Sequence, residues 1–202
     1  MARLLLIRHG RSTWNAAGRI QGQADPPLDD VGREQARQLG ERLLANRPVA
    51  LYTSPLRRAT ETAGIIGDRL GISPVPDERL KEYDVGDITG LTWEQVVKQH
   101  PGVATDWKNA EEPCIPGEEG RDRFRARVVA AFEEIGSQHS GEAAGVVAHG
   151  GTLGTYLVHL LGLSISYSPF GFDNGSLSIV QLDAVKPRIL LLNDTCHLGG
   201  ET

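Results

Sequence analysis

The side chains best suited to chemistry in this sequence stand directly after two short apolar segments. Leu4–Ile7 runs into Arg8-His9-Gly10, and Ala144–Ala148 runs into His149-Gly150-Gly151. The carboxyl ends of parallel strands meet at one edge of an α/β sheet, so both histidines are expected there. A glycine-rich turn that opens a helix presents backbone N–H groups to an anion. The pattern therefore predicts a site that holds an anion against a nucleophile.

Two neighbouring arginines, Arg57 and Arg58, follow a third apolar segment, Val49–Thr53, across Ser54-Pro55-Leu56. They stand at the start of a predicted helix near the same sheet edge. Cations at a helix N-terminus oppose the helix dipole, which calls for an anionic partner. At least one of the two is therefore expected to point at a bound phosphate or at a carboxylate.

Acidic residues gather in the segment Leu80–Asp87. If this segment folds over the sheet edge, one of its carboxyl groups can serve as a general acid. The spacing leaves Glu82, Asp84 and Asp87 as candidates.

Strand and helix signals alternate along the chain. Apolar segments predict strands over residues 3–7, 49–53 and 144–148, with a weaker extended stretch at 72–75. Helical patterns cover residues 29 or 30 to 46, 56–70, 121–138 and 152–161, with a short helical piece at 93–99. Residues 176–182 and 188–192 are expected to pair as closing strands around a turn at 183–187.

This alternation predicts an α/β fold with three α/β/α layers and a mostly parallel central sheet. No repeat, low-complexity tract or linker divides the sequence, so residues 1–202 are expected to form one domain. Segment 83–119 is rich in glycine, proline and charge, and we expect it to cap one edge of the sheet over the active site.

Composition and charge restrict the class of function. The chain has 202 residues and a formal net charge of −5, which argues against nucleic acid as a partner. Cys114 and Cys196 are too few and too far apart for a disulfide framework or a metal-ligand pattern. The first apolar run ends at Arg8, and no segment reaches the length of a membrane-spanning helix. We therefore expect a cytoplasmic protein that binds neither nucleic acid nor membrane.

The ordered set of motifs resembles the histidine phosphatase superfamily, in the branch of the cofactor-dependent phosphoglycerate mutases and related phosphatases. The matching pieces span nearly the whole chain in the family's order: Arg8-His9-Gly10, Trp14-Asn15, Gln21-Gly22, Ser54-Pro55-Leu56, Arg58-Ala59, Leu80 with Glu82, His149-Gly150-Gly151 and Asn193-Asp194-Thr195. The resemblance implies the phosphoglycerate mutase-like fold, which agrees with the alternation of strands and helices.

The resemblance also implies a role for each site residue. His9 would be the nucleophile and form a phosphohistidine. Glu82 would be the general acid and base. Arg8, Arg58 and His149 would form a cationic phosphate pocket. Further phosphate or substrate contacts are expected from Asn15, Gln21, Gly22 and Gly150.

Arg11 departs from the family pattern, which usually has Glu or Gln at this position. One interpretation is an ordinary surface residue. The other places Arg11 at the pocket mouth, where its charge would favour a substrate with a second anionic group.

The expected function is a phosphatase that hydrolyses a small phosphorylated metabolite without metal or other cofactor, because cationic side chains take the role of Mg²⁺. One alternative is a cofactor-dependent phosphoglycerate mutase, which would need a bisphosphoglycerate primer. Another is a non-catalytic phosphate-binding protein on the same fold. The stretch from Glu82 to His149 is short for a mutase of this family, and no catalytic residue of the pattern is missing, so a phosphatase is favoured. A monomer or a homodimer is expected.

Overall fold

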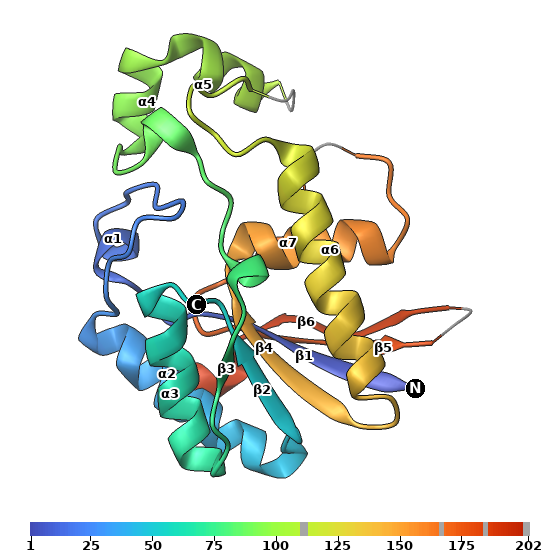
Figure 1. Cartoon of the computed structure of the whole chain (residues 1–202). Coiled ribbons are helices and arrows are strands. Elements are labelled where there is room, and N and C mark those ends of the chain that lie inside the picture. Colours follow the sequence, from blue (N-terminus) through green and yellow to red (C-terminus); the bar gives the residue numbers. More distant parts are fainter. Residues whose placement is uncertain (110–112, 166–167, 184–185, 200–202) are drawn as a thin grey trace.

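A central sheet organises the computed structural model, which describes residues 1–109, 113–165, 168–183 and 186–199. In these residues six strands lie in the order β3-β2-β4-β1-β5-β6 (Figure 1). Their bounds are β1 (Ala2–Arg8), β2 (Ala50–Thr53), β3 (Val75–Pro76), β4 (Ala143–Ala148), β5 (Leu177–Leu182) and β6 (Arg188–Asp194). The first four pair in parallel, and β5 and β6 add an antiparallel edge. The predicted mostly parallel sheet is confirmed.

Helices cover both faces of this sheet (Figure 1). Those on one face are α2 (Asp30–Leu43) and α3 (Arg57–Leu70), and those on the other are α6 (Arg121–Gln138) and α7 (Gly150–Leu160). Successive side chains of a strand point to opposite faces. In β1, Leu5 and Ile7 therefore pack with α2 and α3, while Leu4 and Leu6 pack with α6 and α7. The three-layer α/β/α prediction is confirmed.

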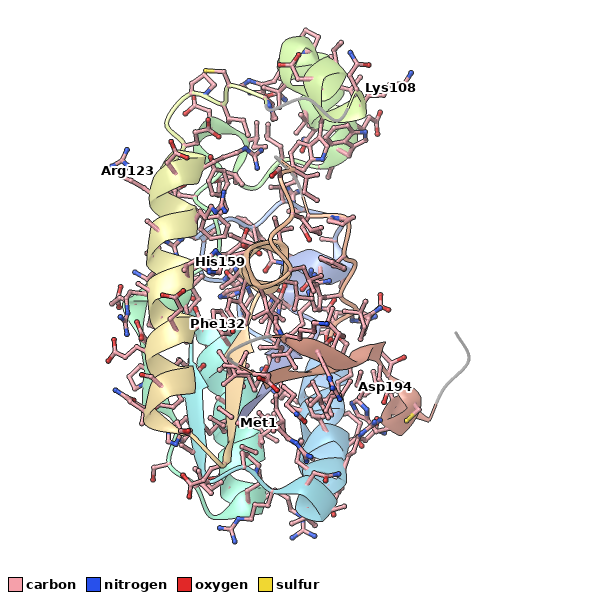
Figure 2. All side chains as sticks on the ribbon, turned by 90° about the vertical axis from the view of Figure 1, so that its right-hand side faces the viewer. Met1, Lys108, Arg123, Phe132, His159 and Asp194 are labelled. Atoms are coloured by element: carbon pink, nitrogen blue, oxygen red, sulfur yellow. The ribbon has the colours of Figure 1, made fainter. Side chains whose placement is uncertain are left out.

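Helix α6 has an apolar inner side and a charged outer side, as its sequence pattern predicts. Phe132 is fully buried and stacks on Tyr156 of α7 with 4.1 Å between ring centroids. Arg123 points away from the body of the protein (Figure 2). This stacking fixes α6 against α7 on the same face of the sheet.

Helix boundaries mostly follow local signals. Asp29 Oδ1 accepts a hydrogen bond from Gly32 N at 2.8 Å and so caps α2. Gly71 ends α3 in the left-handed conformation, with φ +66°. The larger differences from the prediction are that α2 ends at Leu43 before a 3-10 turn and that α7 begins at Gly150 rather than at residue 152. The glycine turn after β4 is itself the first turn of α7.

Segment 83–119 extends beyond the carboxyl ends of the parallel strands (Figure 1). It contains the predicted helix α4 (Trp93–Gln99) and also α5 (Pro101–Lys108), which the sequence analysis missed. Proline at the first helical position lacks only an N–H that would be unpaired there, so Pro101 opens α5 instead of breaking it. The short helix α1 (Thr13–Ala16) was missed as well.

The single domain over residues 1–202, with 83–119 as its cap, stays a prediction. Parts of two predicted segments, residues 110–112 of the cap and 184–185 of the closing turn, lie outside the described residues.

Two glycines bring the loop after β1 into direct contact with α2. A Cβ at Gly10 would lie 2.3 Å from the carbonyl oxygen of Gly32, and a Cβ at Gly32 would lie 2.1 Å from the carbonyl oxygen of Arg11. Asp29 N donates to the same Arg11 oxygen at 3.0 Å. The N-terminus of α2 therefore fixes the course of the chain immediately after His9.

The Gly32→Ala variant is expected to lower the free energy of unfolding by about 1–3 kcal/mol, because the added methyl group forces two backbone segments apart. Gly64→Ala in the middle of α3 is the matched control, since nothing lies within 4 Å of the added atom. The control should be neutral or stabilise by up to about 1 kcal/mol. Urea unfolding of both variants measures the difference, and equal stability of the two would contradict the close contact.

Candidate active site

Segments that are distant in sequence meet at the carboxyl edge of the parallel strands. β1 ends at Arg8 and is followed by His9, β2 leads to Arg58 at the start of α3, and β4 leads to His149. Glu82 follows a 3-10 turn after β3. Because β5 runs antiparallel to β1, the loop before β5 also reaches this edge. The structure therefore brings the main predicted site residues to one place.

The imidazole of His9 is held in one tautomer. Its Nδ1 lies 2.7 Å from the carbonyl oxygen of Gly10. A carbonyl oxygen can only accept a hydrogen bond, so Nδ1 carries the hydrogen and Nε2 keeps its lone pair. Arg58 Nε donates to this Nε2 at 3.2 Å. His9 thus has Nε2 available as a nucleophilic atom.

Burial among cations keeps both site histidines neutral. The residue His9 is 2% exposed and His149 is 1% exposed. Burial lowers the pKa of His9 well below 6.5, and the charges of Arg58 and then Arg8 lower it further. The pKa of His149 is lowered in the same way, first by burial and then by Arg58 and its other basic neighbours. A neutral imidazole retains the lone pair that an attack on an electrophile requires.

Arg58 is a guanidinium group held out of water by backbone carbonyl groups. It is 1% exposed, and it donates to the carbonyl oxygens of Ala24 at 2.7 Å and Gly22 at 2.9 Å. Burial lowers its pKa to about 10, which leaves it charged at neutral pH. In the described part of the chain, neither Arg58 nor Arg8 forms an ion pair. The site holds positive charge without a paired carboxylate.

Two buried donor atoms, Arg8 Nε and His149 Nδ1, have no hydrogen-bond partner among the described residues. Arg8 is anchored by its Nη1, which donates to the carbonyl oxygen of Phe172. His149 Nε2 lies 2.7 Å from Ser54 Oγ, which also accepts from Leu56 N at 3.3 Å. When the Ser54 hydroxyl donates to Nε2, Nδ1 carries the hydrogen. Buried polar atoms without partners are costly, and a bound oxyanion is one partner that would satisfy them.

The carboxyl group of Glu82 is held at the N-terminus of α7. Its Oε2 accepts from Gly151 N at 2.9 Å, and its Oε1 accepts from Tyr83 N at 2.8 Å. A Cβ at position 151 would lie 2.4 Å from Oε1, so only glycine allows this approach.

Of the three acidic candidates, Glu82 lines the same cavity as His9, and Asp84 and Asp87 are not among the lining residues. Asp84 Oδ1 instead accepts from Gly86 N at 3.1 Å within its own turn.

The predicted accessory residues Asn15, Gln21, Gly22 and Gly150 also line this cavity. Asn15 Oδ1 accepts from Ser12 N at 3.0 Å, which leaves its amide nitrogen as the donor. Gly22 contributes its carbonyl oxygen to Arg58 rather than an N–H to the cavity.

The structure does not place Arg11 with this group, contrary to the interpretation at the pocket mouth. Arg11 is not among the residues that line the cavity. Its Nε donates to Asp29 Oδ2 at 2.6 Å in a partly exposed ion pair. Asp29, the residue that caps α2, therefore holds the Arg11 side chain in place.

The cavity has a volume of about 740 Å³, and it extends well beyond the phosphate-sized end. Its outer wall is largely aromatic, with Tyr83, Trp107, Phe124 and Phe170. Arg121 at the start of α6 lines the same wall, with its guanidinium carbon 5.4 Å from the centre of the Tyr83 ring. This half of the cavity can contact the part of a substrate that does not react.

Sequence reasoning missed three residues that support the site. Asn174 Nδ2 donates to the carbonyl oxygen of His9 at 3.2 Å, and Ser54 orients His149. Arg127 of α6 donates to the carbonyl oxygen of Glu82 at 2.9 Å. A signal existed for Asn174, since Asp173-Asn174-Gly175 is a polar cluster directly before an apolar strand.

Across the described ranges, no group of three or more His, Cys, Asp or Glu side chains is placed to hold a metal ion. No helix within those ranges has the length and apolar character to cross a membrane.

Comparisons with known proteins agree with this geometry. The family model of the histidine phosphatase superfamily (branch 1) matches residues 4–195. Phosphoserine phosphatase 1 of Hydrogenobacter thermophilus is 34% identical, over 98% of this chain and 95% of that protein. The metal-independent phosphoserine phosphatase of Arabidopsis thaliana is 37% identical, over 98% of this chain and 83% of that protein.

A solved structure gives the same result for the fold. The mycobacterial glucosyl-3-phosphoglycerate phosphatase in complex with VO3 superimposes with a TM-score of 0.84 at 31% sequence identity, covering 96% of this chain and 99% of that chain. The expected phosphatase activity on phosphomonoesters is thereby confirmed. The chain belongs to the histidine phosphatase superfamily, branch 1, and is a phosphomonoester hydrolase.

Proposed function

We propose that this phosphatase works through a phosphohistidine on His9, with Glu82 as the proton donor. His9 Nε2 attacks the phosphorus atom, an N–P bond forms, and the P–O bond to the alcohol breaks. Glu82 gives its proton to the departing oxygen. Arg8, Arg58 and His149 Nδ1–H bind the phosphoryl oxygens and stabilise their charge.

A water molecule then completes the reaction. Its oxygen bonds to phosphorus, the N–P bond breaks, and its proton passes to Glu82, which is protonated again for the next cycle. Inorganic phosphate leaves, and His9 regains its lone pair.

One observation carries this proposal: a neutral imidazole with its Nε2 lone pair free of a proton shares a cavity with Arg8, whose buried Nε has no hydrogen-bond partner among the described residues. Arg58 Nε donates to Nε2 in this structure, so a substrate phosphoryl group would replace that contact with its own oxygen. Arg58 stays in place meanwhile, because two carbonyl oxygens hold its other nitrogens.

We propose that no metal or other cofactor takes part. Buried guanidinium groups can neutralise the phosphoryl charge as Mg²⁺ does elsewhere. The name of the Arabidopsis relative, a metal-independent phosphoserine phosphatase, supports this proposal.

A phosphoglycerate mutase would share the first half of the reaction and would require a bisphosphoglycerate primer. The stretch between Glu82 and His149 is short for a mutase of this family, which favours water as the acceptor of the phosphoryl group. His9, Glu82, Arg8 and Arg58 line one cavity, and this combination of nucleophile, acid and cations is more than a non-catalytic phosphate-binding role needs.

The substrate that fits best is a small phosphorylated metabolite with a carboxylate near the ester. Phosphoserine and glucosyl-3-phosphoglycerate, which appear in the names of two relatives, both have this chemistry. Arg121 on the outer wall is the residue we assign to the carboxylate. Arg19 lines the cavity as well, with its Nη1 donating to the carbonyl oxygen of Gly90 at 2.6 Å.

Location and assembly are proposals as well. Cys114 and Cys196 are both exposed free thiols, which suits a reducing compartment such as the cytoplasm. The enzyme would act there as a monomer or homodimer without nucleic acid or membrane as partner.

The phosphohistidine is tested by incubating the protein with a phosphomonoester labelled in its phosphoryl group and measuring the label that stays on the protein. The stability of this label in acid and in base distinguishes an N–P bond from an O–P bond. The wild-type protein should hold a label that is lost in acid and kept in base, as a phosphohistidine is. The His9→Ala variant should hold none and lose activity by at least about 10³-fold. A labelled or fully active His9→Ala protein would refute the mechanism.

The protonation of His9 is open to a direct test by ¹⁵N NMR of histidine-labelled protein. At pH 6.5 an ordinary histidine is about half protonated, whereas His9 should show a neutral ring with the hydrogen on Nδ1. The urea-unfolded chain serves as the reference. Because the unfolded chain takes up protons first as the pH falls through 6.5, the stability contributed by neutral His9 should decline below that pH. A cationic ring in the folded protein at pH 6.5 would be incompatible with this site.

The carboxylate assignment is tested with 3-phosphoglycerate and glycerol 3-phosphate, which differ in the carboxylate alone. The wild type should prefer the carboxylated ester by about 10-fold or more in kcat/KM, as a charged hydrogen bond allows. Arg121→Ala should remove this preference, whereas Arg11→Ala, outside the cavity, should keep it. If Arg121→Ala slows both esters equally, the carboxylate lies elsewhere. The same assays with and without primer separate hydrolysis from mutase activity.

A further inference from the structure

The backbone of the loop that carries Glu82 accepts hydrogen bonds from Arg127 of helix α6. Arg127 lies two turns into α6 and directs its guanidinium group at the backbone of residues 79–82. We propose that Arg127 is the positioning residue that places the Glu82 carboxyl group for proton transfer. This inference rests on the proposed role of Glu82 as the general acid.

Every N–H of the Arg127 guanidinium group has an acceptor. Nη1 donates to the carbonyl oxygens of Arg79 at 2.8 Å and Lys81 at 2.6 Å, and Nη2 donates to that of Glu82 at 2.9 Å. The two remaining bonds go to Glu119, from Nη2 at 2.6 Å and from Nε at 2.9 Å. Five donors in one plane match the geometry of arginine and of no other side chain.

Glu119 adds a hydrogen bond to the backbone on the C-terminal side of Glu82. Its Oε1 accepts from Asp84 N at 2.9 Å while it is paired with Arg127. The Arg127–Glu119 pair therefore holds the backbone from Arg79 to Asp84, with Glu82 in the middle.

The Arg127–Glu119 ion pair is partly buried, so solvent weakens it less than it weakens an exposed pair. The side chains of Arg127 and Glu119 are 19% and 16% exposed. The ring of Phe124 lies 4.8 Å from the guanidinium carbon and limits its rotation. A partly buried, bidentate pair of this kind is more rigid than a solvated one.

The Glu82 carboxyl group depends on this backbone as well as on its contact with α7. Oε1 accepts from the adjacent Tyr83 N, so this contact moves with the loop. Among the described residues, Gly151 N at 2.9 Å and the hydroxyl of Thr152 at 3.5 Å contact the carboxyl group from α7, and the same hydroxyl donates to the Lys81 carbonyl oxygen at 3.0 Å. Gln23 Nε2 adds one bond to the Glu82 carbonyl oxygen at 3.1 Å. A shift of the loop would carry the carboxyl group away from the leaving oxygen while His9 and its phosphate pocket stay in place.

The experiment uses the dependence of the rate on the leaving group. An alkyl phosphate needs a proton on its departing alkoxide, whereas p-nitrophenyl phosphate releases a stabilised phenolate and needs general acid catalysis much less. The value of kcat/KM for each ester is measured for the wild type, Glu82→Gln, Arg127→Lys and the double variant. Arg127→Lys keeps the positive charge but cannot form the five planar bonds.

Loss of the general acid in Glu82→Gln should lower kcat/KM for the alkyl ester by about 10²–10⁴-fold, with a much smaller loss for p-nitrophenyl phosphate. Arg127→Lys should show the same selective loss, by about 10-fold or more for the alkyl ester. In the Glu82→Gln background, Arg127→Lys should add no further loss, because the two residues act as one unit. Arg123→Lys, an exposed arginine on the same helix, is the matched control and should behave as the wild type.

Equal losses for both esters in Arg127→Lys, or losses that multiply in the double variant, would show a merely structural role while leaving the role of Glu82 intact. A Glu82→Gln variant without leaving-group dependence would overturn both the acid and its positioning. If circular dichroism shows that Arg127→Lys does not fold, the same measurements are made on Glu119→Gln. This variant weakens the Arg127–Glu119 ion pair by removing the charge of its acidic partner. It must then give the same selective loss, and a uniform loss overturns the proposal.

Discussion

The guanidinium groups of Arg8 and Arg58 are held largely out of water at this site, and neither forms an ion pair with a carboxylate of the described residues. The rest of the site depends on this arrangement. Removing a guanidinium group from water is costly unless its hydrogen bonds are met. For Arg58 the backbone meets them, through the carbonyl oxygens of Gly22 and Ala24. Because carbonyl groups carry only partial charge, the site keeps a net positive field. Burial first, and then this field, keeps His9 neutral, and the field attracts a phosphate dianion to the site.

The same field controls the nucleophile. The Gly10 carbonyl oxygen selects the tautomer of His9, and Arg58 covers the lone pair that this tautomer exposes. In the mechanism we propose, a phosphoryl group that binds Arg58 would replace this contact and expose the lone pair. Arg58 would then take part both in binding the substrate and in activating His9.

The sequence predicted that His9 and His149 would lie at one edge of the sheet, because strand ends have a strong local signature. A buried apolar run followed by Arg8-His9 or by His149-Gly150 needs no long-range information to interpret. The sequence could not predict contacts between residues that are distant along the chain. Asn174 reaches His9 only because β5 lies antiparallel beside β1, and Arg127 reaches Glu82 only because α6 crosses the loop after β3. Arg11 was placed by its closeness to His9 in sequence, whereas the α2 cap at Asp29 decides its direction. Helix α5 was hidden by the Pro101-Gly102 pair, which opens it.

The two halves of the cavity have different origins in the fold. Arg8 and His9 of its reacting end stand at the end of a buried strand and Glu82 stands on a connecting loop, while its outer wall comes from connecting segments, including Tyr83, Trp107 and Phe170. A substitution in a connecting segment leaves the sheet and its charges undisturbed. Evolution can therefore exchange the outer wall, and with it the preferred substrate, while inheriting the chemistry unchanged. A lineage built on this plan would diversify by drift in its connecting segments, and members with one mechanism would come to serve unrelated metabolites.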